Sequence, residues 1–272
     1  MLVEERILSI QEAFQIGKLE GELSGILSEY QFETALSNEF ISVAFEGCSM
    51  AIAITSLKNR DSLIDWHLFV SQKGQNYLSQ IHVGLGWALA ELKLPIQQYL
   101  ISIDPKWQLR VLDGFGYYCG LFRRREAIRT MSFPTEIPEA LYAGFNQGIG
   151  RFLFYLAQGD VERLSRNIEL FADNRHADFW RGIGIAATFI GLESTDTVNA
   201  LFDESGEHSK QFAVGIAMAA VSIGHFEHTI SNSQLVINEL TIKYPNFISH
   251  IQQLDSKNER SFVEYVNALI YI

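Results

Sequence analysis

The chain has few of the features that mark disulfide-bonded, secreted or membrane-spanning proteins. Its 272 residues include two cysteines, Cys48 and Cys119, neither in a CxxC pattern, which argues against a disulfide framework. No run reaches the roughly 18 uninterrupted apolar residues that cross a bilayer. The N-terminus, MLVEERILSI, lacks the basic head and apolar core of a secretory signal. We therefore expect a cytoplasmic protein that does not span a membrane.

Positive charge is also scarce. The chain has 21 Lys and Arg against 32 Asp and Glu, a net charge of −11, and such a field repels nucleic-acid phosphates. Nucleic acid is therefore not an expected partner. Five prolines is a low count that suits a helical protein, and a hydrophobic share of 47% supplies ample material for a sizeable core.

Motifs for nucleotides, metals and serine nucleophiles are missing as well. The sequence contains no GxxxxGK[ST], no GxSxG and no HExxH. His225 and His228 lie three residues apart and would supply two metal ligands, but a third is not evident. We predict neither a metal site nor a cofactor.

What the sequence does contain is a recurring Gly-apolar-Gly pattern. It is complete or degenerate in six segments: FEGCSMAIAITSL (45–57), HVGLGWALAELKL (82–94), LDGFGYYCGLFRR (112–124), NQGIGRFLFYLAQ (146–158), WRGIGIAATFIGL (180–192) and QFAVGIAMAAVSI (211–223). Alignment on Gly47, Gly84, Gly114, Gly148, Gly182 and Ala213 gives offsets of 37, 30, 34, 34 and 31 residues. A glycine inside a helix costs about 1 kcal/mol relative to alanine, so close packing of neighbouring helices has to offset that cost.

Offsets of this size match the length of one helical hairpin. The alternative is that small residues are common in any buried helix and that the alignment is fortuitous. Asp160, after Gly159, and the segment 194–196 are expected to cap second helices of such hairpins. The best strand candidate, QYLISID at 98–104, is short and is also compatible with a helix. We predict an all-α chain of about six degenerate helical-hairpin repeats in one domain, 1–272. Within it, residues 1–40 form N-terminal capping helices, 41–228 the repeat core and 229–272 C-terminal helices.

The same segments resemble, in order, the successive blocks of a bacterial domain-of-unknown-function family. The likeness runs from about residue 40 to 230. Members of that family tend to be encoded beside enediyne and other polyketide or natural-product biosynthesis genes. The resemblance implies a role in specialised metabolism with a small apolar or polyunsaturated ligand, and it supplies no catalytic residues.

Several residues are candidates for chemistry. Asp113 stands before an aromatic-rich segment, either as a helix N-cap or as a carboxylate beside an aromatic cavity that acts as a general acid or base. His82, Gln147 and Arg181 stand at what the alignment treats as equivalent places, and stacking in register would align them along one wall. We take Asp113 and His82 as candidate catalytic residues. Candidate substrate-binding residues are Tyr117, Tyr118, Trp87, Arg151, Trp180 and Arg181.

The alternative for each of these residues is a purely structural role, as a helix cap, a core residue or a salt-bridge partner. Arg151 in particular needs a partner if it is buried. The basic run Arg123, Arg124 and Arg125 is expected to be a solvated helix face, or else the binding point of an acidic protein partner or of a phosphate-bearing ligand.

These expectations favour an enzyme that binds a polyene-, polyketide- or terpenoid-like molecule and catalyses cyclisation, isomerisation or a related proton-driven step. Two alternatives remain open. Helical-repeat arrays are often adaptors for other proteins, and a purely apolar cavity would indicate a non-catalytic carrier of an apolar intermediate.

Overall fold

The computed structural model describes residues 3–26, 29–123, 137–192, 194–222, 234–249 and 264–266, and in these ranges all regular structure is helical. The all-α class is therefore confirmed. The long helices are α1 (Val3–Ser24), α3 (Asn38–Arg60), α5 (Leu78–Glu91), α7 (Pro105–Phe122), α8 (Tyr142–Ala157), α10 (His176–Ile190) and α12 (Ser209–Ser222). The shorter ones are α2 (Phe32–Ala35), α4 (Ile64–Gln72), α6 (Ile96–Leu100), α9 (Val161–Ile168), α11 (Thr195–Ser205) and α13 (Gln234–Lys243).

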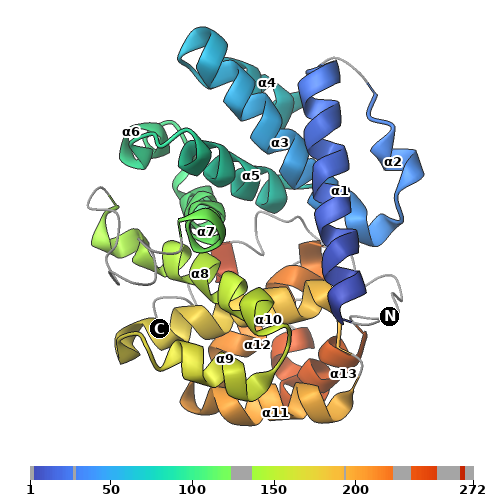
Figure 1. The fold of residues 1–272 in the computed structure, drawn as a ribbon, viewed down its shortest axis with the longest axis vertical. Coiled ribbons are helices and arrows are strands. Elements are labelled where there is room, and N and C mark those ends of the chain that lie inside the picture. The colour runs from blue at the N-terminus through green and yellow to red at the C-terminus, as the bar shows by residue number, and fades with distance from the viewer. Residues whose placement is uncertain are drawn as a thin grey trace.

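The long helices pack in chain order, each against the next. Helices α3, α5, α7, α8, α10 and α12 follow one another along the molecule, and α1 runs beside them (Figure 1). Shorter helices α4, α6, α9, α11 and α13 lie between or after the long ones in the chain. A hairpin array predicts such a long–short alternation, but among the described residues no shorter α-helix stands between α7 and α8, and the repeat itself stays a prediction.

The glycine pairs lie where consecutive long helices touch. A Cβ built on Gly114 of α7 would lie 1.9 Å from the carbonyl oxygen of Val83 in α5, and one on Gly116 would lie 2.2 Å from that of Phe145 in α8. The first glycine of the pair therefore faces the preceding helix and the second faces the following one. The same two-sided contact recurs for Gly84 and Gly86, Gly148 and Gly150, and Gly182 and Gly184. Backbone contact at these points leaves no room for a side chain.

The contacts also correct the alignment of the sixth segment. Each first glycine meets the carbonyl of the residue that precedes the first glycine of the previous helix, as Gly182 meets Gln147. In α12 this contact is made by Gly215, which meets Arg181, and not by Ala213. The alignment on Ala213 was therefore two residues out of register.

Helix boundaries bear out some of the expected signals and correct others. Asp160 and Ser194 cap α9 and α11 with side-chain hydrogen bonds to Arg163 N and Asp196 N, as expected. The N-cap interpretation of Asp113 is wrong, because α7 begins eight residues earlier and its N-cap is Asp104, followed by proline. The strand candidate at 98–104 begins as the end of α6.

Helix α1 connects distant parts of the array. Its Gly17 packs against the carbonyl of Ala44 in α3, so α1 joins the same series of glycine contacts. At its other end the buried Arg6 donates to the carbonyl of Phe189 in α10 (3.3 Å) and pairs with Glu39. The helix therefore spans from α3 to α10. Among the described helices, Asn38–Arg60 is long and apolar enough to cross a membrane, but most of it is buried inside the fold.

Candidate functional site

A cavity of about 540 Å3 lies between α1 and the long helices that it spans. We call it the central cavity. Its lining residues are Leu8, Ile10, Gln11, Glu12, Phe14, Gln15, Val43, Glu46, Trp87, Tyr117, Leu121, Phe122, Arg151, Tyr155 and Phe189. Leu8, Glu12 and Phe122 are exposed, whereas Phe14 and Glu46 are buried, so the charged groups of the floor lie below a partly open mouth of mixed polar and apolar residues. This volume falls in the range of small-molecule sites.

Two charged side chains of opposite sign, Glu46 and Arg151, line this cavity although they are at least nine-tenths buried. Their closest atoms, a guanidinium nitrogen of Arg151 and Oε1 of Glu46, are 3.9 Å apart. The same guanidinium lies 3.0 Å from Oδ1 of Asp113, which is also buried. One cation therefore serves two carboxylates, and the trio carries a net negative charge unless one carboxyl binds a proton.

Glu46 is the carboxyl with the more open coordination. Its Oε1 accepts from Nε1 of Trp87 at 2.9 Å, and no described residue donates to Oε2. In contrast, both oxygens of Asp113 accept, one from Arg151 and the other from Nε2 of Gln147 at 2.6 Å. Burial raises the pKa of Glu46 to about 7, because desolvation and the charge of Asp113 outweigh the opposing effects of Arg151 and Trp87. Glu46 thus exchanges its proton near neutral pH.

A chain of buried polar side chains extends from this trio along the array. Gln147 bonds Asp113 and in turn accepts from Nε of Arg181 at 2.6 Å. Arg181 is fully buried and also donates to Gln211 (2.9 Å) and Asp178 (2.8 Å). Every charged side chain in this hydrogen-bonded series has a counter-charge or a neutral acceptor, which is the condition for burying a charge. Arg181 therefore holds the network together at a distance from the cavity.

The members of this network occupy corresponding positions relative to the glycine pairs of their helices. Asp113, Gln147 and Arg181 each precede the first glycine of a helix, and the structure brings them together as the sequence predicted. Glu46 precedes Gly47 in the same way, but sequence reasoning missed it, although the register supplied the signal. In α5 the residue that precedes the first glycine is Val83. His82 lies one residue earlier and borders a different pocket.

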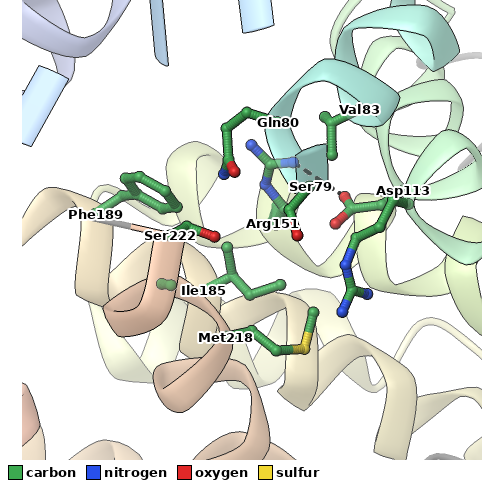
Figure 2. A pocket seen from close by; sticks show the side chains of 11 residues that line it. Ser79, Gln80, Val83, Asp113, Arg151, Ile185, Phe189, Met218 and Ser222 are labelled. Atoms are coloured by element: carbon green, nitrogen blue, oxygen red, sulfur yellow. Dashed lines mark hydrogen bonds and ion pairs between the residues drawn. The ribbon is translucent and has the colours of Figure 1, made fainter. Parts of the chain in front are cut away.

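Arg151 and Asp113 also border a second, much smaller pocket of about 20 Å3 (Figure 2). Figure 2 shows their ion pair beside Ser79 and Gln80 of α5, opposite Ile185 of α10 and Met218 of α12. A space of this size holds little more than a water molecule. Asp113 thus faces this small pocket and is not among the lining residues of the central cavity.

Aromatic rings form one wall of the central cavity. The ring of Tyr117 lies 5.2 Å from that of Trp87 and receives the guanidinium of Arg151 over its face at 4.6 Å. Tyr118, predicted to bind substrate, packs behind Trp87 at 5.8 Å and is not a lining residue. Trp180 is buried against Phe212 of α12 and lines none of the three pockets described for this structure. Of the predicted binding residues, Trp87, Tyr117 and Arg151 therefore reach the cavity.

The structure separates His82 from Asp113. His82 is stacked on Trp107 at a centroid distance of 4.9 Å and borders a third pocket, distinct from the central cavity. The expected shared wall of His82, Asp113 and Arg181 is therefore formed by the latter two alone, through Gln147.

Other candidate residues lie apart from the cavity or outside the described ranges. Arg123 donates to the carbonyl of Ala90 near the end of α5 at 2.5 Å, whereas Arg124 and Arg125 lie outside the described residues. His225 and His228 are outside them too. The described part of the chain shows no group of three or more potential metal ligands. Cys48 and Cys119 are buried and are not joined in a disulfide.

Comparison with known proteins identifies the family of this helical, cavity-containing chain. A family model described as a protein of unknown function (DUF1702) matches residues 26–261, and the chain belongs to that family. A search of the curated proteins finds no match, and neither does a search of the solved structures.

Proposed function

We propose that the protein is an enzyme that binds an apolar carbonyl compound of polyketide type in the central cavity and moves a proton on it with Glu46. The observation that carries this proposal is the pair of buried charged groups, Glu46 and Arg151, in the floor of a cavity whose walls are otherwise largely aromatic and aliphatic. A purely apolar carrier has no need of them, since burying such groups is costly. The role in cytoplasmic specialised metabolism rests on the sequence resemblance and composition.

The proton-exchanging group of this proposal is Glu46 in place of Asp113. Asp113 has donors on both oxygens and lines the small pocket instead of the central cavity, so we assign it a positioning role. It holds Arg151, and its negative charge helps to raise the pKa of Glu46.

The acidity of Glu46 selects among proton-driven reactions. A carboxyl with a pKa of about 7 is too weak an acid to protonate an isolated alkene, but it is well matched to removing a proton next to a carbonyl group. The guanidinium of Arg151 lines the cavity beside Glu46. We assign it to the carbonyl oxygen, where it stabilises the negative charge that develops.

The proposed step is balanced without an oxidant or reductant. The Glu46 carboxylate takes the proton from the carbon next to the carbonyl, and the C–H electron pair forms an enolate whose oxygen faces Arg151. Glu46 then returns the proton to another carbon, which shifts a double bond. In a cyclisation the enolate attacks a second carbonyl, and Glu46 protonates the resulting alkoxide. The faces of Trp87 and Tyr117 hold the conjugated chain.

The test is incubation of the protein with metabolite extract from a strain that lacks its gene, followed by untargeted mass spectrometry. We expect a product with the wild type and with the control Glu162→Gln, whose carboxylate is exposed on α9. Glu46→Gln should retain a ligand but form no product. Equal turnover by Glu46→Gln would overturn the role of Glu46, and retention without conversion by the wild type would indicate a carrier. Absence of any retained or converted compound would favour the adaptor alternative.

Asp113→Asn tests the positioning role with a different readout. Since Glu46 starts as a base, kcat/KM should rise with pH through about 7 in the wild type. Removal of the Asp113 charge lowers the pKa of Glu46, so this rise should move to lower pH. An unchanged profile would show that Asp113 does not act on Glu46.

A further inference from the structure

A third pocket, of about 230 Å3, lies between α4, α5 and the start of α7 and shares no lining residue with the central cavity. We call it the histidine pocket. Its lining residues are Trp66, His67, Val70, Gln75, Leu78, His82, Ser102, Ile103, Asp104 and Trp107. The floor is buried, whereas His67, Gln75 and Asp104 are exposed at the mouth. The pocket is smaller than typical sites for drug-sized ligands, so it suits one ring or two fused rings.

The floor presents an unused hydrogen-bond acceptor. His82 is 4% exposed, and its Nδ1 lies 2.7 Å from the carbonyl oxygen of Leu78, one turn back in α5. A carbonyl only accepts, so Nδ1 carries the hydrogen and Nε2 keeps its lone pair. No described residue donates to Nε2, and His82 is one of the residues that line the pocket.

The charge state of the ring fits this assignment. Burial lowers the pKa of His82 to about 4, with a further contribution from the nearby His67, while the bond to Leu78 opposes the shift. The ring is therefore neutral at physiological pH. Asp104 at the mouth is paired with Lys106 at 3.0 Å, so the mouth supplies no uncompensated charge from this residue.

The walls around His82 are flat, aromatic and fixed. The rings of His82 and Trp107 are nearly parallel, with an interplanar angle of 14°, and Trp66 meets His82 edge-on at 5.2 Å. Trp66 is held by its Nε1 bond to Oγ of Ser49, which in turn donates to the carbonyl of Ile81. Such preorganised aromatic faces bind a planar ligand at low cost in side-chain entropy.

We infer that the histidine pocket is a second ligand site, which takes a small, uncharged aromatic molecule and accepts a hydrogen bond from its hydroxyl or ring N–H group at Nε2 of His82. The inference is independent of the reaction proposed for the central cavity. It assigns His82 to recognition of a separate ligand rather than to proton transfer.

The experiment uses phenol as the probe and anisole, which has the same ring without a donor, as the matched control. Both are titrated into the full chain, and tryptophan fluorescence reports binding at Trp66 and Trp107. One hydrogen bond to an otherwise unused acceptor is expected to give phenol an advantage of about tenfold in affinity. Trp87→Phe removes the indole of the central cavity, so the signal should persist in that variant.

His82→Phe keeps a flat ring beside Trp107 but removes Nε2. We expect the preference for phenol to fall below about twofold in this variant and to remain in His208→Phe, a partly exposed histidine far along the chain. Nitrogen NMR of histidine-labelled wild type is the second readout: phenol, and not anisole, should shift the unprotonated Nε2 resonance of His82. Equal affinities for phenol and anisole, a preference that survives His82→Phe, or an Nε2 signal that does not respond would each overturn the inference.

Discussion

At the residue scale, the most consequential side chain is Glu46, because it is a buried carboxyl that shares its only counter-charge, Arg151, with Asp113 among the described residues. Arg151 lies nearer to Asp113 than to Glu46, and Asp113 has a second donor in Gln147. The proton of the trio therefore goes to Glu46. This asymmetry, and not the identity of either carboxylate alone, determines which one exchanges protons at neutral pH.

The raised pKa has a consequence for stability. Between the ordinary value of 4.5 and about 7, the folded protein holds the Glu46 proton while the unfolded chain has lost it. Stability therefore falls as pH rises through this window, by about 3 kcal/mol for a shift of this size. Glu46→Gln removes this dependence, so the variant should match the wild type near pH 5 and exceed it at pH 8. Urea unfolding at both pH values measures this.

A variant that is less stable than the wild type at pH 8 would show that the Glu46–Arg151 interaction outweighs the desolvation cost. Glu162→Gln, which changes an exposed carboxylate, controls for the loss of one negative charge.

At the scale of elements, glycine pairs set the distance between consecutive helices. Contacts such as that of Gly114 with the backbone of Val83 bring the main chains together over the whole array. A backbone carbonyl cannot move aside as the end of a flexible side chain can. The helices are therefore fixed in register by their main chains, and side chains such as Asp113 and Gln147 are brought to matching heights.

Gly114→Ala should consequently lower the free energy of unfolding by about 3 kcal/mol or prevent folding, since overpacking of this kind forces a backbone shift. Gly74→Ala is the control: its Cβ would meet the terminal Cδ1 of Ile81, while the nearest backbone atom, Cα of Val70, is 3.3 Å away, so a smaller loss of about 1 kcal/mol is expected. Thermal and urea unfolding of the two variants provide the comparison. Similar losses in both would refute the packing role of Gly114.

The same glycines explain how much of the fold could be predicted. Their spacing predicted helices in close contact, because few other structures favour glycine inside an apolar run. The start of α7 was missed because Asp113-Gly114 resembles a turn, whereas the effective signal was Asp104 followed by proline. The register of α12 was misread because Ala213-Val-Gly215 has the same spacing as a glycine pair, and only contact with Arg181 distinguishes the two.

The site was less predictable than the fold. Asp113, Gln147 and Arg181 come together because each of them directly precedes the first glycine of its helix. The pairing of Arg151 with Asp113 has no such signal, because it joins residues 38 apart on neighbouring helices. The spacing of residues in the sequence does not show which residue of the neighbouring helix a long arginine side chain will contact. The sequence also did not predict that α1 forms a wall of the central cavity, because the position of α1 depends on where α10 lies in the folded array.

At the scale of the whole molecule, α1 is the element that encloses the central cavity. It supplies several lining residues, among them Ile10 and Phe14, and is tied to α3 by Gly17 and to α10 by Arg6. The guanidinium of Arg6 also lies over the ring of Phe40 at 4.4 Å. Loss of this one side chain therefore frees one end of the cavity wall.

Arg6→Met should speed amide hydrogen exchange in the first half of α1 by at least about tenfold while exchange in α12 stays unchanged, since a local opening costs only the contacts it breaks. Hydrogen exchange read by mass spectrometry measures both helices. Arg166→Met, which removes an exposed partner of Glu162, is the control. Unchanged exchange in α1 would show that Gly17 and the apolar contacts alone hold the helix.

The connection between Arg6 and Phe189 also bears on the order of folding. Most helix contacts join segments about one hairpin apart in the chain, and such short loops close quickly. The Arg6–Phe189 bond spans 183 residues and forms only when α3 to α10 already stand in place. During synthesis α1 therefore packs on α3 first, and its contact with α10 waits until more than half of the chain has emerged, so the wall of the central cavity is completed late.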